Sequence, residues 1–335
     1  MSGLRTDKQL AFFLKGLAIL AVVGLHLLTL LPSSIYFSNS TQLAFLSFDQ
    51  LLRFCVPVFI FLSGYGLSLK YQTKALNLVG FYRSRIIKLL PLYLLWSAYY
   101  LFLSEFIEPW WKVLQTGPIW KILLLGWSDY HLYFISVIFQ LYLLYPLLLK
   151  LIKSFPKTTL ALSLLTQLGL YAYFSVTNNP PPDQIQNTLF LSWIFYFVLG
   201  IFLAGRKSFL SQKAGFLIAV FGLILSIFDT HQYLNSTQSL ILAIRSTKIS
   251  QLLYSFGFIT FFLNRPQSTS ENKLINWLGK NSFLIYLSHP VLIHLANFNP
   301  TEIPILQALL SFIIMLFISI KIEHLQKGVL FARKP

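Results

Sequence analysis

Two ionisable side chains, Lys15 and His26, lie in one long apolar stretch near the start of the chain. Eleven helical steps of about 100° return to within roughly 20° of the starting direction, so both side chains share one helix face about 16 Å apart along the axis. Ionisable groups inside a membrane helix usually face the bundle interior or a wet cavity. A buried imidazole is expected to be neutral, the form that takes a proton from a hydroxyl. The alternative is a structural His26 that hydrogen-bonds a neighbouring helix.

Other reactive side chains are open to two interpretations. His131 and His289 lie near the outer ends of predicted spans, where a substrate-binding or a structural role fits. Cys55 is a nucleophile that carries a covalent intermediate or, in the favoured interpretation, a small buried hydrophobe. Ser63, beside Gly64, allows close helix packing or hydrogen-bonds a ligand. No His-x-x-x-His or His-Glu pair marks a metal site, so we expect no metal.

The composition requires a lipid environment for these residues. The chain has 335 residues, of which 56% are hydrophobic and 11% charged, and its mean hydropathy is +0.67. Soluble domains do not have this composition. The net charge of +16 does not indicate nucleic-acid binding, because the basic residues fall between apolar stretches and there face anionic lipid or an anionic ligand.

The apolar stretches predict an all-α integral membrane protein with about ten transmembrane helices in a single bundle, and one domain over residues 1–335. A helix needs about 20 mostly apolar residues to span a bilayer. The candidate spans are 11–31, 51–69, 86–104, 132–149, 159–175, 189–204, 214–230, 249–263, 281–297 and 304–322. The eighth is the weakest, because Arg245 and Lys248 precede it; one long helix, a broken helix and a re-entrant turn all fit that region.

Basic residues set the expected orientation. Most of the 26 Lys and Arg residues flank the spans on the side that carries the N-terminus. Lys and Arg are retained in the cytoplasm, so both termini are predicted to be cytoplasmic in a multi-pass protein of the cell (inner or cytoplasmic) membrane. Arg245 and Lys248 are uncommon on the outer side, where they contact either an anionic ligand or the membrane interface.

Five motifs occur in a recognisable order. They are residues 15–26 (KGLAILAVVGLH), 56–65 (VPVFIFLSGY), 81–93 (FYRSRIIKLLPLY), 131–146 (HLYFISVIFQLYLLYP) and 278–290 (LGKNSFLIYLSHP). Together they resemble the membrane acyltransferase-3 family. That resemblance implies acyl transfer, commonly of acetyl, from acyl-CoA to a hydroxyl of a carbohydrate or glycolipid, as in O-acetylation of polysaccharides, with His26 as the base.

The sequence departs from the family pattern at three places. Lys15 stands where many members have Arg, and Lys88 takes the second position of the Arg-x-x-Arg pair that Arg85 begins. Lysine keeps the charge but loses bidentate geometry. Many members also have a glutamate near the positions of Ile138 and Phe139. A carboxylate that orients the histidine must then come from elsewhere, and topology leaves three candidates: Glu105, Asp129 and Asp229.

The resemblance indicates which ligand the basic residues bind. Acyl-CoA, with acetyl-CoA the expected donor, carries several phosphates, which need fixed cations. Arg83, Arg85 and Lys88 lie where a cytoplasmic opening is expected, and Lys15 is on the same side, although retention of basic residues in the cytoplasm places cations here in any membrane protein. The rival functions are a transporter or flippase of a glycan or lipid-linked sugar and a non-catalytic membrane scaffold.

Overall fold

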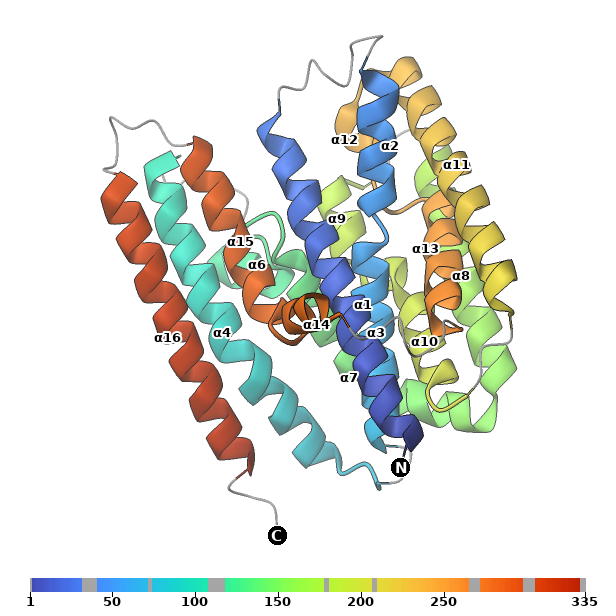
Figure 1. Ribbon diagram of the computed structural model, residues 1–335, viewed down its shortest axis with the longest axis horizontal. Coiled ribbons are helices and arrows are strands. Elements are labelled where there is room, and N and C mark those ends of the chain that lie inside the picture. Colours follow the sequence, from blue (N-terminus) through green and yellow to red (C-terminus); the bar gives the residue numbers. More distant parts are fainter. Residues whose placement is uncertain are drawn as a thin grey trace. The chain divides into compact units, whose positions relative to one another are not determined.

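All regular structure in the described part of the chain is helical. The computed structural model describes residues 2–31, 41–71, 74–107, 118–177, 181–206, 210–264, 272–297 and 305–331. Its helices are α1 (Ser2–Leu27), η1 (Leu28–Leu30), α2 (Gln42–Leu52), α3 (Cys55–Tyr71), α4 (Leu78–Ile107), α6 (Ile119–Leu125), α7 (Tyr133–Ser154), α8 (Pro156–Val176), α9 (Asp183–Thr188), η3 (Phe190–Ser192), α10 (Ile194–Leu203), α11 (Gln212–Thr237), α12 (Leu240–Ala243), α13 (Ile249–Leu263), α14 (Lys273–Lys280), α15 (Ser282–Asn297) and α16 (Ile305–Phe331) (Figure 1).

Each predicted span overlaps a helix, although the span 51–69 crosses the break between α2 and α3 and the span 189–204 includes η3 and α10. The all-α prediction is confirmed for the described residues. Six helical segments there are long and apolar enough to cross a membrane: Lys8–Leu30, Gln42–Tyr71, Leu78–Leu103, Tyr133–Ser154, Pro156–Val176 and Gln212–Thr237. α10, α13 and α15 are shorter apolar helices. The count of ten and the cytoplasmic termini stay predictions.

The chain divides into two compact units. Unit 1 comprises Met1–Lys74 and Leu144–Ser282, and unit 2 comprises Ala75–Leu143 and Phe283–Pro335. Lys15, His26 and Ser63 therefore belong to unit 1, whereas Arg83, Arg85, Lys88, His131 and His289 belong to unit 2. The expectation of a single domain stays a prediction.

Glycines bring the helices of unit 1 into close contact. On α3, a Cβ at Gly64 would overlap the carbonyl of Phe197 on α10, and a Cβ at Gly200 of α10 would overlap the carbonyl of Phe61. α11 and α13 approach each other in the same way around Gly222 and Gly257. Small residues let membrane helices pack backbone to backbone, because little other driving force holds helices together in lipid. The packing role expected for Gly64 is confirmed.

The region before the eighth span is a broken helix. α11 ends at Thr237, and Gln238 takes a left-handed conformation with φ 55°. The one-turn helix α12 and a turn then precede α13, which begins at Ile249. Arg245 and Lys248 lie in that turn, and each is only 5% exposed. The turn thus directs two basic side chains into unit 1.

Hydrogen bonds from aromatic side chains join the helices of unit 2. The indole of Trp96 on α4 donates to Ser319 of α16 at 3.0 Å, and the Tyr100 hydroxyl donates to the carbonyl of Leu287 on α15 at 2.6 Å. Tyr286 of α15 donates to the carbonyl of His131, just before α7. Buried Trp and Tyr side chains need such partners. These bonds fix the position of the segment that carries His131.

Candidate functional site

α1 holds Lys15 and His26 on one continuous helix, as the sequence predicts. Both residues are half-buried. α1 crosses α14 closely, because a Cβ at Gly16 would overlap the carbonyl of Ile275 and a Cβ at Gly279 would overlap the carbonyl of Phe12. The first and the last of the five sequence motifs thus meet at a glycine-to-backbone contact, which explains why glycine occurs in both.

The Lys15 half of α1 also attracts a cation from α14. The ammonium groups of Lys280 and Lys8 lie 5.7 Å and 5.8 Å from the ring centroid of Phe12. Cation–π contacts of this kind hold a lysine over an aromatic ring while its charge stays accessible. Three lysines therefore gather along this half of α1 in unit 1. Lys280 adds a third lysine to this half of α1. Sequence spacing could not predict this, because it does not show that α14 packs against α1.

The basic residues of α4 do not all lie on one face. Arg85 and Lys88 are three residues apart and therefore neighbours on the helix surface, whereas Arg83 and Arg85 are separated by about 200°. Arg85 is half-buried, with its guanidinium 5.8 Å from the ring centroid of Phe81 and 5.7 Å from that of Tyr142. Arg83 and Lys88 are exposed. The aromatic rings hold Arg85 in place, so it is the best-fixed cation of the three.

Unit 2 contains a carboxylate shared by two imidazoles. Asp129 Oδ1 lies 2.9 Å from His131 Nδ1, and Asp129 Oδ2 lies 2.6 Å from His294 Nε2. The Asp129 side chain is only 7% exposed. An ionised carboxylate only accepts hydrogen bonds, so the two histidine nitrogens that face it carry hydrogens. His131 and His294 thereby each have one ring nitrogen fixed by Asp129.

The electrostatics of this group favour an ionised Asp129. Burial by itself would raise the pKa of Asp129, but the hydrogen bonds and positive charge of His131 and His294 outweigh it and hold the pKa well below its usual range. The Tyr100 ring meets the His131 ring edge-on at 5.1 Å between centroids, and His289 lies 5.4 Å from His131. Aromatic rings and an ion pair therefore enclose His131, which is 2% exposed.

His289 and Ser63 make short-range bonds within their own helices. His289 Nδ1 lies 2.8 Å from the carbonyl of Tyr286, so that nitrogen is the donor. The Ser63 hydroxyl donates to the carbonyl of Phe59 at 2.9 Å, one turn earlier on α3. Such back-bonding satisfies a hydroxyl in an apolar helix. The packing interpretation of Ser63 gains support, and its substrate-binding role stays a prediction.

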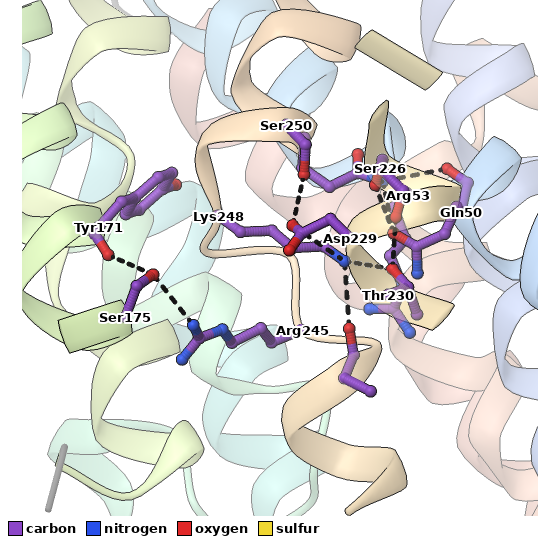
Figure 2. Close-up of polar contacts among 12 residues, drawn as sticks. Gln50, Arg53, Tyr171, Ser175, Ser226, Asp229, Thr230, Arg245, Lys248 and Ser250 are labelled. Atoms are coloured by element: carbon purple, nitrogen blue, oxygen red, sulfur yellow. Dashed lines mark hydrogen bonds and ion pairs between the residues drawn. The ribbon is translucent and has the colours of Figure 1, made fainter. Parts of the chain in front are cut away.

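Unit 1 has its own buried charges (Figure 2). Arg53 binds both carboxylate oxygens of Asp49, at 2.5 Å and 2.8 Å. Lys248 donates to Thr230 and to the carbonyl of Ala243, and its ammonium lies 3.9 Å from Asp229. Arg245 donates to the hydroxyl of Ser175 at 3.2 Å and to the carbonyl of Phe174. Arg245 and Lys248, considered above for an anionic ligand or the interface, are thus bound by protein groups.

The structure shows the hydrogen-bond partners of two of the three candidate carboxylates. Asp129 binds His131 and His294, and Asp229 accepts from Ser250 at 2.9 Å near Lys248. The side chain of Glu105 lies outside the described residues. The Asp129–His131 pair could have been found from sequence, because the two residues are two apart. His294, which topology places at a border, gave no such signal. Cys55 is buried, as the favoured interpretation expects.

Among the described residues, no group of three or more His, Cys, Asp and Glu side chains is arranged to hold a metal ion. The polar side chains that the structure brings together there include imidazoles, one shared carboxylate, lysines and arginines. Such groups can accept a proton, donate hydrogen bonds or bind an anion.

Comparisons with known proteins identify relatives of the chain. A family model described as an acyltransferase domain, that of the acyltransferase-3 family, matches residues 13–324. A relative from Bacillus subtilis (strain 168), named "Putative membrane-bound acyltransferase YfiQ", is 26% identical over 324 residues, which cover 89% of this chain and 85% of the relative. No solved structure matches the chain.

Proposed function

Because the chain belongs to the acyltransferase-3 family, we propose that it moves an acyl group, most simply acetyl, from acyl-CoA to a hydroxyl of a carbohydrate or glycolipid acceptor. The observation that carries this proposal is the continuous helix α1, which holds a cation and an imidazole on one face. A relative named as membrane-bound and the six candidate spans support a place in the cell membrane.

The donor is proposed to bind through its phosphates. Coenzyme A carries a pyrophosphate and a 3′-phosphate, which several fixed cations must balance. Each unit offers its own candidates: unit 1 has Lys8, Lys15 and Lys280 along α1, and unit 2 has Arg85 and Lys88 on α4, with Arg83 on another face of that helix. Arg85 is the strongest ligand, because a guanidinium binds phosphate bidentately and two aromatic rings fix it.

His26 is proposed as the base. It accepts the proton of the acceptor hydroxyl as the hydroxyl oxygen bonds to the acyl carbon, and the C–S bond of the thioester then breaks. Coenzyme A leaves as a thiolate, which takes up the proton that His26 received. General-base assistance of this sort contributes about 10²–10⁴-fold to the rate. His131 and His289, which both belong to unit 2, are proposed to bind substrate.

The test is transfer of radiolabelled acetyl from acetyl-CoA to octyl β-D-glucoside, a soluble glycoside with free hydroxyls, by the purified protein. Labelled glycoside is the expected product. Release of labelled acetate alone shows thioester hydrolysis, which contradicts the proposed acceptor class. Label that stays in acetyl-CoA contradicts acyl transfer altogether.

A transporter or flippase of a glycan is the alternative, since buried polar residues in membrane helices also serve transport. Reconstitution into vesicles separates the two functions. An acyltransferase modifies the glycoside without net flux, whereas a transporter moves the unmodified glycoside across the vesicle membrane in the absence of acetyl-CoA.

A further inference from the structure

One nitrogen of His131 has no role in the hydrogen bonding described so far. Its Nδ1 is bound by Asp129, but its Nε2 is buried and has no hydrogen-bond partner among the residues that the structure describes. A buried polar atom without a partner costs roughly 1–3 kcal/mol, so native structures rarely keep one without a reason. His131 is 2% exposed, which excludes bulk water as the ready partner.

The neighbours of His131 keep this nitrogen in a fixed place. Asp129 holds Nδ1, Tyr286 donates to the carbonyl of His131, and the Tyr100 ring packs edge-on against the imidazole. His294 holds the second carboxylate oxygen of Asp129, so the carboxylate itself cannot turn. A rigid donor aimed at a fixed point is what stabilises charge that develops in a transition state.

Asp129 also decides what His131 can do. Its ionised carboxylate stabilises a positive charge on the adjacent imidazole, and an imidazolium carries a hydrogen on Nε2 as well as on Nδ1. Attack on a thioester places negative charge on the acyl oxygen, which needs a donor.

We propose that His131 is a second catalytic residue, whose Nε2–H donates a hydrogen bond to the acyl oxygen of the donor thioester, with Asp129 as its positioning residue. This inference rests on the proposed acyl transfer. It adds no proton transfer: the bond to the acceptor oxygen forms, the C–S bond breaks, and His131 keeps both of its protons throughout.

The helix α4 links this role to donor binding inside unit 2. Arg85, proposed to bind donor phosphate, and Tyr100, which touches His131, lie fifteen residues apart on α4, or about 22 Å along the axis. Coenzyme A has its phosphates at one end and its thioester at the far end of a long flexible arm. A donor held at Arg85 and lying along α4 would therefore present its thioester toward His131.

The experiment measures acetyl transfer from acetyl-CoA to octyl β-D-glucoside by wild-type protein and by the variants His131→Leu, His131→Gln and Asp129→Asn. Leucine removes the donor and should lower kcat about 10²–10³-fold, with the affinity for coenzyme A unchanged. Glutamine keeps a neutral N–H donor and should recover part of that loss. Size-exclusion elution and melting temperature confirm that each variant is folded.

The two polar variants separate a donor from a base and test the positioning role. Glutamine keeps an N–H donor but cannot act as a base, so a His131→Gln rate as low as that of His131→Leu overturns the donor role. Asp129→Asn keeps the size of the side chain but removes the carboxylate that holds His131 Nδ1, so kcat should fall while the affinity for coenzyme A stays unchanged. An unchanged kcat in folded Asp129→Asn overturns the positioning role.

The remaining outcomes distinguish the two proposals. A wild-type rate retained within about threefold in His131→Leu overturns the role of His131 alone. No transfer by wild-type protein overturns the proposed function and this inference with it. If the variants do not fold, nitrogen NMR of histidine-labelled wild-type protein decides, since a deprotonated His131 Nε2 at neutral pH contradicts the donor role.

Discussion

The buried basic side chains of unit 1 and the imidazole group of unit 2 are both polar clusters in apolar surroundings, yet they differ in whether their hydrogen-bond donors have partners. In unit 1, Arg53, Arg245 and Lys248 each donate to carboxylates, hydroxyls or carbonyls of the same unit. In unit 2, Asp129 uses both of its oxygens, but His131 Nε2 has no partner among the described residues.

That difference separates a cluster with a structural role, called the scaffold below, from a group that can bind a substrate. Buried charges persist in a protein when partners satisfy them, and their chief effect is then on packing and specificity of the fold. A donor that is fixed but unused can serve a substrate. Substitutions in the unit 1 cluster should therefore change stability, and substitutions of histidines that face substrates should change rate.

The largest expected effect is the loss of kcat in His26→Ala. If that loss does not occur, the contrast between residues that act on stability and residues that act on rate is wrong. His26 belongs to unit 1 but not to its charged cluster, and His26→Ala should lower kcat by about 10²–10⁴-fold because the base is gone. Affinity for coenzyme A should stay unchanged in a binding titration. The exposed His324 provides the control variant His324→Ala, which should keep the wild-type rate. A His26→Ala protein with substantial acetyl transfer removes His26 from the role of base.

Asp49→Ala tests the structural role of the unit 1 cluster. It leaves the Arg53 guanidinium, whose side chain is 14% exposed, without its carboxylate. Breaking a fully buried ion pair costs about 3–5 kcal/mol of stability. We expect a lower free energy of unfolding in denaturant titrations, with kcat per folded molecule unchanged. Asp49→Asn, which keeps a hydrogen-bond acceptor, should lose less. A fall in kcat without a fall in stability would place the cluster in the catalytic machinery.

Arg85→Glu and Arg83→Glu form a matched pair on α4. Charge-assisted hydrogen bonds contribute about 1.5–3 kcal/mol, so reversal at Arg85 should weaken coenzyme A binding by roughly 10–100-fold. Arg83 lies on another face of the helix and should show a much smaller change, which isothermal titration would resolve. Equal losses in both variants would indicate a general effect of charge rather than a phosphate ligand at Arg85.

Much of the fold follows from hydropathy, because membrane helices satisfy their own backbone hydrogen bonds and must be apolar. The ten predicted spans overlap helices for that reason. The sequence left the break near Gln238 as one of three alternatives. It could not show that the turn directs Lys248 inward, because the bond to Thr230 joins residues 18 apart in the sequence.

The candidate site was accessible from sequence only in part. Lys15 and His26 share a helix, so their spacing alone predicts their common face. Asp129 was one of three candidate carboxylates, because topology places residues on one side of a membrane but does not choose partners. Its bond to His294, 165 residues away, is a tertiary contact that no local pattern encodes.

A different measurement, the pH dependence of stability, sharpens the contrast at Lys248, in the turn before α13. Burial lowers the pKa of Lys248 to about 7, although Asp229 opposes the shift. The folded protein therefore binds fewer protons than the unfolded chain between pH 7 and the ordinary lysine value of 10.5, so stability should rise with pH across that window. Below pH 7 the buried charge exerts its full destabilising effect.

Lys248→Met should remove this pH dependence, because methionine fills a similar volume without a charge. Melting temperatures recorded from pH 6 to pH 10 would show it as a flatter curve than that of the wild type, and the exposed Lys280 gives the control variant Lys280→Met. If the wild-type curve is already flat, or if Lys248→Met leaves its slope unchanged, the buried ammonium is not the group that titrates. If Lys248→Met instead abolishes acetyl transfer while remaining folded, Lys248 is part of the reaction and the separation between scaffold and site is wrong.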